Sequence, residues 1–353
     1  MKRLLCLVLC AVVLFSLCAC DMKKSVTDEQ FALDTFITFN ITAESEHRAQ
    51  QVIADLKNEI NSLEGILSAT KEGSDVYNVN NRLYNSTDFK RVVVNDCTSD
   101  LIRRACEISK SVDGAFDISV YPLVKLWGFD SKDYRVPSDS EIADTLKAVG
   151  YQNISVNSDN TVELKDNMSI DLGAIAKGYI GERIYELMKN SLISKGIVNL
   201  GGMVVTCNNI DSDKWSIGVE HPGSGEVFMS FDTSERYVVT SGAYQRYFEQ
   251  EGEVYHHILD TKTGKPSNSD ISSVTVVGAD GVMGDALSTA FYVMGVEKTI
   301  EYIRENTYTV DDTFNVIILS SDMKDLYITA DLAGSGYELD KQYKDINVHI
   351  IDV

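Results

Sequence analysis

Two short segments in the second half of the chain carry side chains that could do chemistry together. The first, residues 255–266, contains the adjacent histidines His256 and His257 and ends in a Gly/Pro turn. The second lies farther along the chain and places a carboxylate four residues before a hydroxyl, at Asp285 and Thr289. Imidazoles act as general bases, and carboxylate and hydroxyl oxygens bind hard cations. The combination favours phosphoryl-type chemistry on a metal-bound nucleotide, so we expect an enzyme before a binding protein.

Asp285 and Thr289 would share one face of a helix, because residues four apart lie one turn apart. Oxygen ligands completed by carbonyls and waters suit Mg²⁺, whereas Zn²⁺ prefers His or Cys. A helix-capping aspartate beside a surface threonine is the alternative interpretation of the same pair. The spacing therefore predicts a magnesium site and leaves the structural role open.

A strand-to-helix corner is predicted at residues 169–179, where Asp171 is followed by Gly173 and Lys177. Free N–H groups at the start of a helix favour a ligand phosphate or a polar ring edge. Asp171 as a plain N-cap and Lys177 as a solvated helix residue form the alternative. The segment is neither a GxGxxG nor a Walker loop, so it does not fit the standard dinucleotide or P-loop patterns.

The N-terminus has the pattern of a signal peptide. Lys2 and Arg3 precede an uncharged run that ends at Cys20, and the run is short for a membrane-spanning helix. Its last four residues, Leu-Cys-Ala-Cys, resemble the bacterial lipoprotein box. We expect residues 1–19 to be removed and Cys20 to be acylated, which would anchor the mature chain on the extracytoplasmic side of the cell membrane. An uncleaved anchor is the alternative.

Composition narrows the function further. Loss of Lys2 and Arg3 leaves 30 basic against 53 acidic residues, a formal charge of −23 for the mature chain. A chain this acidic repels nucleic acid and anionic lipid. Beyond the signal, the spacing of Cys97, Cys106 and Cys207 predicts neither a disulfide framework nor a zinc site, and we expect small buried side chains there.

No repeat or linker divides the body, so the sequence predicts one continuous α+β domain over residues 31–353, after a polar tether at residues 20–30. Helical apolar spacing and strand-like alternation indicate the main elements. Strands are expected at 31–43, 91–94, 154–156, 161–164, 196–200, 215–220, 237–241, 273–278, 315–320 and 326–330. Helices are expected at 46–67, 99–112, 139–149, 174–189, 284–294 and 296–306.

Taken in order, eight motifs resemble one family. One of them is the aromatic-rich loop that begins at residue 114. By itself this loop could contact a flat ligand ring or simply belong to the core. The resemblance is to the ApbE family, the FAD:protein FMN transferases, and it runs from about residue 31 to 305. The motifs are 74–80 (SDVYNVN), 114–117 (GAFD), 122–129 (PLVKLWGF), 171–178 (DLGAIAKG), 199–202 (NLGG), 240–244 (TSGAY), 257–264 (HILDTKTG) and 285–289 (DALST).

The resemblance implies a T-fold-related α+β domain of mixed sheets and packed helices that moves FMN from FAD to a Thr or Ser hydroxyl of an acceptor protein, with Mg²⁺, and releases AMP. It implies His257 as the base that removes the hydroxyl proton, since His257 and not His256 matches the position before Ile-Leu-Asp. Metal-ligand positions carry over to the Ala174 carbonyl, Asp285 and Thr289. FAD-contacting positions carry over to Leu33, Thr70, Ala115, Phe116, Asp117, Asp171, Lys177 and His257.

The chain departs from the family pattern at two places. Many relatives have Met-Gly-Thr where this chain has Leu33, Asp34 and Thr35, so Asp34 adds a Cβ and a negative charge where glycine lets the ligand approach. Thr70 stands where many relatives have a tyrosine that could stack on the flavin. Both differences bear on how FAD would be held.

Two other functions remain open from the sequence. A Mg²⁺-dependent FAD pyrophosphatase would use the same side chains and give FMN and AMP to water. A lipid-anchored flavin-binding or storage protein would hold FAD without turnover. The sequence does not identify the acceptor protein, although the family resemblance suggests subunits of membrane redox pumps or secreted flavoproteins. The tail from about residue 311 to 353 matches no motif.

Overall fold

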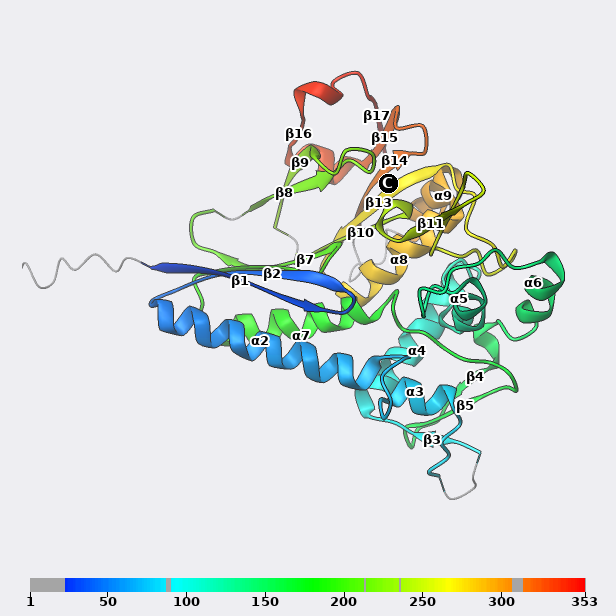
Figure 1. Ribbon diagram of the computed structural model, residues 1–353. Helices are drawn as coiled ribbons and strands as arrows, with labels where there is room; N and C mark the ends of the chain where they lie inside the picture. The colour runs from blue at the N-terminus through cyan, green and yellow to red at the C-terminus, as the bar shows by residue number, and fades with distance from the viewer. Residues whose placement is uncertain (1–22, 87–89, 213, 235, 307–313, 353) are drawn as a thin grey trace, which may run out of the picture.

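The computed structural model describes residues 23–86, 90–212, 214–234, 236–306 and 314–352, which form an α+β domain built on one large sheet (Figure 1). Neighbouring strands of this sheet are antiparallel except for the last pair, which is parallel. The fold class predicted from the sequence is confirmed. In spatial order its nine strands are β1 (Lys24–Ala32), β2 (Thr35–Ala43), β6 (Lys195–Asn199), β7 (Met203–Asn209), β10 (Tyr237–Gly242), β13 (Ile271–Gly278), β14 (Phe314–Ser320), β15 (Asp325–Thr329) and β17 (Asn347–Ile351).

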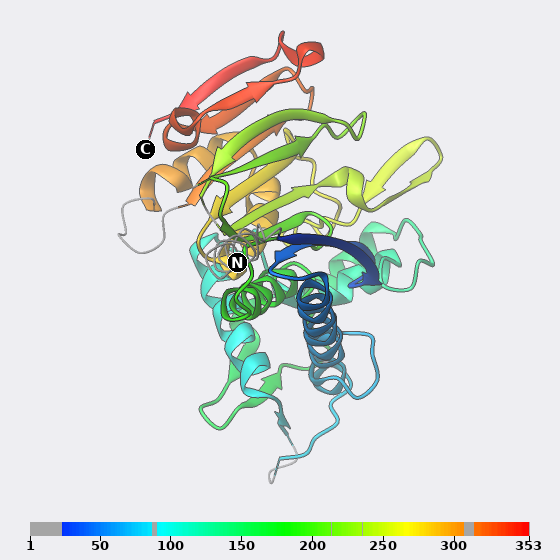
Figure 2. The same cartoon turned by 90° about the vertical axis from the view of Figure 1, so that its left-hand side faces the viewer.

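Helices cover one face of this sheet, with α2 (Glu46–Leu67) and α7 (Ala176–Asn190) packed side by side (Figure 2). Ser45 caps α2 by accepting a hydrogen bond from the Arg48 N–H, and the helix buries apolar residues at helical spacing, among them Val52, Leu56 and Ile60. Beside them lie α8 (Gly281–Met294), α9 (Val296–Asn306) and α4 (Asp96–Ser111). The helical layer thus fixes α7 and α8 against the middle of the sheet.

A second, three-stranded sheet packs on the opposite face of the large sheet. Its strands, in spatial order, are β16 (Tyr337–Leu339), β9 (Val227–Thr233) and β8 (Trp215–Glu220). Ile217, Val219 and Phe231 from this sheet share a buried apolar cluster with residues of β10, β13, β14 and β15. This packing leaves β8 at an edge.

An aromatic cluster supports the segment that carries the two histidines. The hairpin of β11 (Tyr247–Gln250) and β12 (Glu253–His256) stacks Phe248 and Tyr255 on one another, with ring centroids 5.2 Å apart. They pack beside α5 (Tyr121–Trp127), where the Trp127 indole N–H donates to the Gly264 carbonyl at 2.9 Å. Residues 121–127 are therefore helical, although the sequence analysis treated them as part of a loop. Two further helices, α3 (Asp75–Asn80) and α6 (Asp139–Leu146), complete this side of the molecule.

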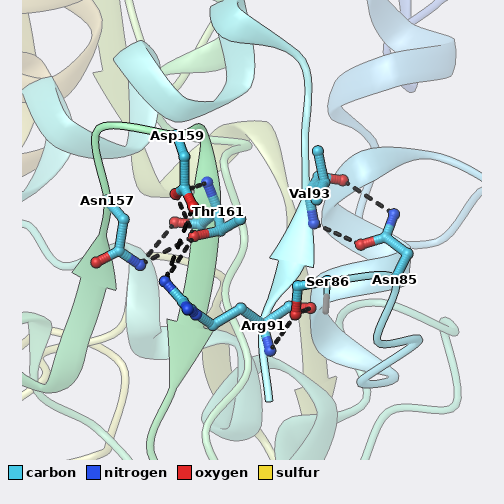
Figure 3. A network of polar contacts seen from close by, with 7 residues as sticks. All are labelled: Asn85, Ser86, Arg91, Val93, Asn157, Asp159 and Thr161. Atoms are coloured by element: carbon cyan, nitrogen blue, oxygen red, sulfur yellow. Dashed lines mark hydrogen bonds and ion pairs between the residues drawn. The ribbon is translucent and has the colours of Figure 1, made fainter. Parts of the chain in front are cut away.

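The small sheet of β3 (Val92–Val93), β5 (Thr161–Leu164) and β4 (Ile154–Val156) is held by polar side chains (Figure 3). The Thr161 hydroxyl donates to Asp159 Oδ1 at 2.6 Å and accepts from the Asn157 amide at 3.0 Å. Arg91 reaches the Thr161 hydroxyl at 3.5 Å and the Asp159 carboxylate at 3.9 Å. These groups satisfy one another around a turn, so the β4–β5 hairpin has the bounds that the sequence predicted.

The expected N-terminal boundary of the domain is wrong. Residues 24–30 were expected in the tether and residues 31–43 in a single strand, but β1 begins at Lys24 and a turn at Leu33 and Asp34 separates it from β2. Both turn residues have positive φ, 55° and 58°. The segment beyond about residue 311, which matches no motif, is part of the domain: β15 and β17 belong to the large sheet and β16 to the three-stranded sheet, with α10 (Ala330–Ser335) between β15 and β16.

The described part of the chain contains no helix that is both long and apolar enough to cross a membrane. The expected signal peptide and Cys20 lie outside the described residues. Cys97, Cys106 and Cys207 are free thiols, of which Cys207 is buried and the other two are half-buried.

Candidate active site

One cavity of about 770 Å³ is lined by all of the predicted catalytic, FAD-contacting and metal-ligand residues. It lies at the N-terminal ends of α7 and α8, beside the β1–β2 turn and the segment that follows β12. Predicted residues from six separate segments of the chain therefore meet there. The predicted residues that line it are Leu33, Thr70, Ala115, Phe116, Asp117, Asp171, Ala174, Lys177, His257, Asp285 and Thr289.

The Asp285 carboxylate sits where helices α7 and α8 meet. Its Oδ2 accepts the Gly178 N–H at 2.9 Å, one of the N–H groups in the first turn of α7 that have no partner within the helix. Ala174 lies just before this helix and lines the cavity. Asp285 is buried, and Thr289 follows one turn later on the same face of α8, as the four-residue spacing predicts.

Glycines make this close approach of α7 and α8 feasible. A Cβ on Gly178 would lie 2.3 Å from the Gly281 carbonyl oxygen, and one on Gly281 would lie 2.8 Å from the Gly178 carbonyl oxygen. Any side chain at these two positions would separate the helices. The small residues thus bring Asp285 within hydrogen-bond distance of the Gly178 backbone.

The three residues predicted as metal ligands line the same cavity and offer oxygen atoms only. They are the Asp285 carboxylate, the Thr289 hydroxyl and the Ala174 carbonyl, and Mg²⁺ prefers oxygen ligands. No group of three or more His, Cys, Asp or Glu side chains that could hold a metal occurs among the residues the structure describes. Lys177 Nζ lies 3.9 Å from Asp285 Oδ1 and 3.3 Å from the Gly173 carbonyl, so a positive charge stands beside the same carboxylate.

The Asp171 side chain closes the turn that precedes α7. Its Oδ1 accepts the Gly173 N–H at 3.0 Å, and its own N–H donates to the Ile118 carbonyl at 2.8 Å. Burial raises the pKa of Asp171, an effect opposed by that hydrogen bond and by the charges of Arg246 and Lys177. The interpretation of Asp171 as a plain N-cap is wrong, because the N-cap position of α7 is Ile175 and Asp171 closes the turn before it. Asp171 also lines the cavity.

His257 is held as a neutral base at the cavity wall. Its Nδ1 lies 3.0 Å from the Arg246 carbonyl oxygen, which can only accept, so Nδ1 carries the proton and Nε2 is left with a free lone pair. Burial and, to a smaller extent, the neighbouring Arg246, His256 and Lys177 charges lower the pKa of His257 to about 4, against the opposing effect of the hydrogen bond to the Arg246 carbonyl. At neutral pH the ring is neutral and can accept a proton at Nε2.

His256 faces a different environment from its neighbour. Its Nε2 lies 3.1 Å from the Ser267 carbonyl oxygen and its ring packs edge-on against Tyr292. Nδ1 is buried without a hydrogen-bond partner among the described residues. His256 lines a separate cavity of about 340 Å³ and not the larger one. The choice of His257 over His256 as the residue at the site agrees with this geometry.

Asp117 is used by the fold itself. Its Oδ1 accepts from the N–H and the hydroxyl of Ser119, at 2.8 and 2.7 Å, and its Oδ2 accepts the Tyr151 N–H at 2.8 Å. Its carboxylate is buried and holds the turn that leads to α5. The residue lines the cavity as predicted, but its side chain is committed to structure.

Sequence reasoning missed residues that lie between β10 and β11. Tyr244, Gln245 and Arg246 line the cavity, and the Gln245 amide donates to the Thr240 carbonyl at 3.1 Å. Tyr244 had been noted within a motif without a role. The carbonyl of Arg246 orients His257 across the β11–β12 hairpin, and only the pairing of those two strands reveals this contact.

Comparison with known proteins agrees with this arrangement. The profile of the ApbE family matches residues 33–314, most of the chain. The chain belongs to the ApbE family. The FAD:protein FMN transferase of Klebsiella pneumoniae (strain 342) is 33% identical over 288 residues, covering 79% of this chain and 87% of that protein. The FAD:protein FMN transferase of Treponema pallidum (strain Nichols) is 31% identical over 260 residues, covering 69% and 71%.

Solved structures of the ApbE family have the same fold. The crystal structure of the ApbE protein from Thermotoga maritima superposes with a TM-score of 0.76 at 30% identity, and covers 92% of this chain and 99% of that one. The flavin transferase ApbE from Vibrio cholerae superposes with a TM-score of 0.74 at 22% identity, covering 89% and 100%. The C-terminal strands beyond the matched profile therefore belong to the same domain.

Proposed function

We propose that this chain is an FAD:protein FMN transferase that attaches FMN to a Thr or Ser hydroxyl of an acceptor protein and releases AMP. Family membership and the printed activity of the curated relatives support flavin transfer to a protein. The observation that carries the proposal is that His257 and the Asp285, Thr289 and Ala174 oxygens open into one cavity. A general base and an oxygen-rich cation site are the two parts that phosphoryl transfer needs.

In the proposed reaction the acceptor hydroxyl oxygen attacks the phosphorus of the FMN half of FAD. A new phosphoester bond forms, the bond from that phosphorus to the bridging oxygen breaks, and AMP leaves with the bridging oxygen. The hydroxyl proton passes to His257 Nε2, whose lone pair is kept available by the Nδ1 hydrogen bond to Arg246. Lys177, beside Asp285, adds positive charge where the phosphates would lie.

The Asp285 carboxylate, the Thr289 hydroxyl and the Ala174 carbonyl would hold Mg²⁺. When bound, the cation would neutralise charge on the pyrophosphate and on the departing AMP. The protein's own part is to orient the Asp285 carboxylate, because the Gly178 N–H bonds its Oδ2 and leaves Oδ1 for the cation.

An assay with three readouts tests the proposal. The chain begun after Cys20 is incubated with FAD and Mg²⁺, with and without a protein that carries a Thr flavinylation motif, and AMP and protein-bound flavin are measured. Covalent FMN on the acceptor together with AMP is the expected result. AMP without labelled acceptor would identify a pyrophosphatase, and intact bound FAD would identify a flavin-binding protein.

The proposed place of action is the extracytoplasmic face of the cell membrane, through a lipid on Cys20. The uncharged N-terminal run and its lipoprotein-like end support this, and redox-pump subunits exposed on that face are candidate acceptors. Growth with an alkyne fatty acid should label the wild-type chain and not the Cys20→Ser variant. Equal labelling of both would refute lipidation at Cys20.

A further inference from the structure

The active-site cavity is bordered by a strand whose outer edge has no partner in the described chain. β8 is an edge strand and pairs only with β9. Four of its residues, 217–220, line the cavity. Among the described strands that lie at the edge of a sheet, β8 is the one that contributes residues to this cavity.

The direction of the β8 backbone groups follows from the pairing of β9. The Asp232 N–H donates to the Gly336 carbonyl at 3.2 Å, on the side of β9 away from β8. In an antiparallel pair, two directly opposite residues behave alike. Either both point their N–H and C=O groups toward each other, or both point them away. Ser216 is opposite Asp232, and Gly218 is opposite Ser230 two residues along. The N–H and C=O groups of Ser216 and Gly218 therefore point away from β9.

These outward groups are available for pairing at the cavity. No described residue hydrogen-bonds to the backbone N–H or C=O of Gly218, which is exposed and lines the cavity. Its neighbours Ile217 and Val219 are buried in the apolar cluster beneath, so the strand is firmly seated. At the other end of β8, the Lys195 Nζ lies over the Trp215 ring, 5.2 Å from its centroid. Edge strands are usually protected along their length, and here the half that faces the cavity is open.

We propose that the acceptor protein docks by adding an extended segment to this β8 edge, with its Thr or Ser hydroxyl entering the cavity toward His257. The inference rests on the proposed function, which requires a polypeptide hydroxyl inside this cavity. An extended segment is the form of polypeptide that can both pair with a strand edge and enter a cavity. Main-chain hydrogen bonds supply affinity in such complexes, while alternate side chains supply specificity.

Two substitutions at one position test the docking. Gly218→Pro removes the outward N–H, and edge strands tolerate proline where the N–H is not part of the ladder. Gly218→Ala is the matched control, because either residue brings a Cβ to 3.0 Å from the Val227 side chain but only alanine keeps the N–H. The expected result is a loss of about tenfold in kcat/KM for the acceptor with proline and a change within about twofold with alanine. FAD affinity, followed by flavin fluorescence, should be the same in both variants. Equal transfer by the two variants would overturn the inference.

Hydrogen exchange on the wild-type chain gives a second test that needs no β8 variant. The probe is the acceptor of the transfer assay with its modified Thr replaced by Ala, so that it binds without being labelled. Slower exchange of the amides in residues 215–220 is expected, and slower exchange confined to other segments would contradict docking at β8. If wild-type enzyme labels the acceptor but both tests fail, only the docking inference falls. If it attaches no FMN at all, the proposed function falls as well.

Discussion

The active-site cavity and the small sheet of β3, β5 and β4 contain the same polar residue types arranged in opposite ways. In the small sheet, Asp159 and Thr161 are two residues apart and bond directly to each other (Figure 3). In the cavity, Asp285 and Thr289 are four apart on one helix face and do not bond to each other. The Asp159 side chain is 61% exposed, whereas that of Asp285 is 4% exposed.

The polar groups of the small sheet serve to stabilise the fold, whereas those of the cavity remain available to a ligand. Around the β4–β5 turn the Thr161 hydroxyl and the exposed Asp159 carboxylate are paired with neighbouring protein groups, so little is left for chemistry. At the cavity, one oxygen of Asp285 is committed to Gly178 and the other faces Lys177 at 3.9 Å. A buried carboxylate kept this way is costly unless a cation or ligand completes its surroundings.

The largest effect is expected at Asp285. Asp285→Asn keeps an oxygen that can accept the Gly178 N–H but removes the charge, so the fold should stay intact while transfer falls by about 10³-fold or more. The rate of FMN attachment and the thermal unfolding curve are measured on the same preparation. If transfer survived with normal stability, the carboxylate would have no catalytic part.

Loss of the proposed base should come next. His257→Gln is expected to lower transfer by about 10²-fold, since a positioned base contributes this order of magnitude. His256→Gln is the control, because that ring lies in the other cavity, and its transfer rate should stay within about twofold of wild type. Equal loss in the two variants would contradict the assignment of His257.

The pH profile examines the same residue without mutation. Because burial lowers the pKa of His257 to about 4, the neutral base persists from alkaline pH down to about pH 5 and is lost as pH falls through about 4. The contribution of His257 to the transfer rate should therefore not change between pH 5 and pH 8. Single-turnover transfer rates across this range check it, and a fall centred near pH 6.5 would show an ordinary, solvated imidazole.

A smaller effect is expected where the two helices cross. A Cβ at Gly178 would overlap the Gly281 carbonyl, so Gly178→Ala should destabilise the fold by about 1–3 kcal/mol and displace Asp285. Urea unfolding measures the stability. Gly65→Ala in α2 is a matched control, since a Cβ there meets nothing within 4 Å, and it should not destabilise.

The smallest effect is expected in the small sheet. Asp159→Ala removes the hydrogen bond to Thr161 and an ion pair with Arg91 at 3.9 Å, and exposed pairs of this kind contribute little. Transfer should remain within about twofold of wild type. A large loss of transfer would mean that polar clusters far from the cavity share in the chemistry, and the comparison between the two regions would fail.

Sequence patterns predicted elements whose burial repeats regularly. The helix at residues 46–67 and the hairpin strands at 154–156 and 161–164 appear with the predicted bounds, because apolar periodicity and turn residues are local signals. β1 was missed because its polar sequence alternates weakly, and its stability comes from pairing with β2 along all nine residues. β14 and β15 appear close to the predicted ranges 315–320 and 326–330, whereas β16 and β17 were not predicted.

The site was predicted through motif resemblance more than through spacing. Asp285 and Thr289 could be paired by helical spacing alone, but their meeting with His257 in one cavity depends on long-range strand order. Arg246 orients His257 only because β11 and β12 form a hairpin. The open edge of β8 has no sequence signature at all, since an unpaired strand is a property of the finished sheet.

The most direct test of the central claim is the ratio of AMP released to FMN attached. Intact-mass spectrometry of the acceptor counts attached FMN, and chromatography of the same reaction counts AMP. The account predicts one AMP for each acceptor that gains one FMN, with neither product formed by Asp285→Asn. AMP in large excess over an acceptor of unchanged mass would contradict it, because the cavity would then be delivering FMN to water.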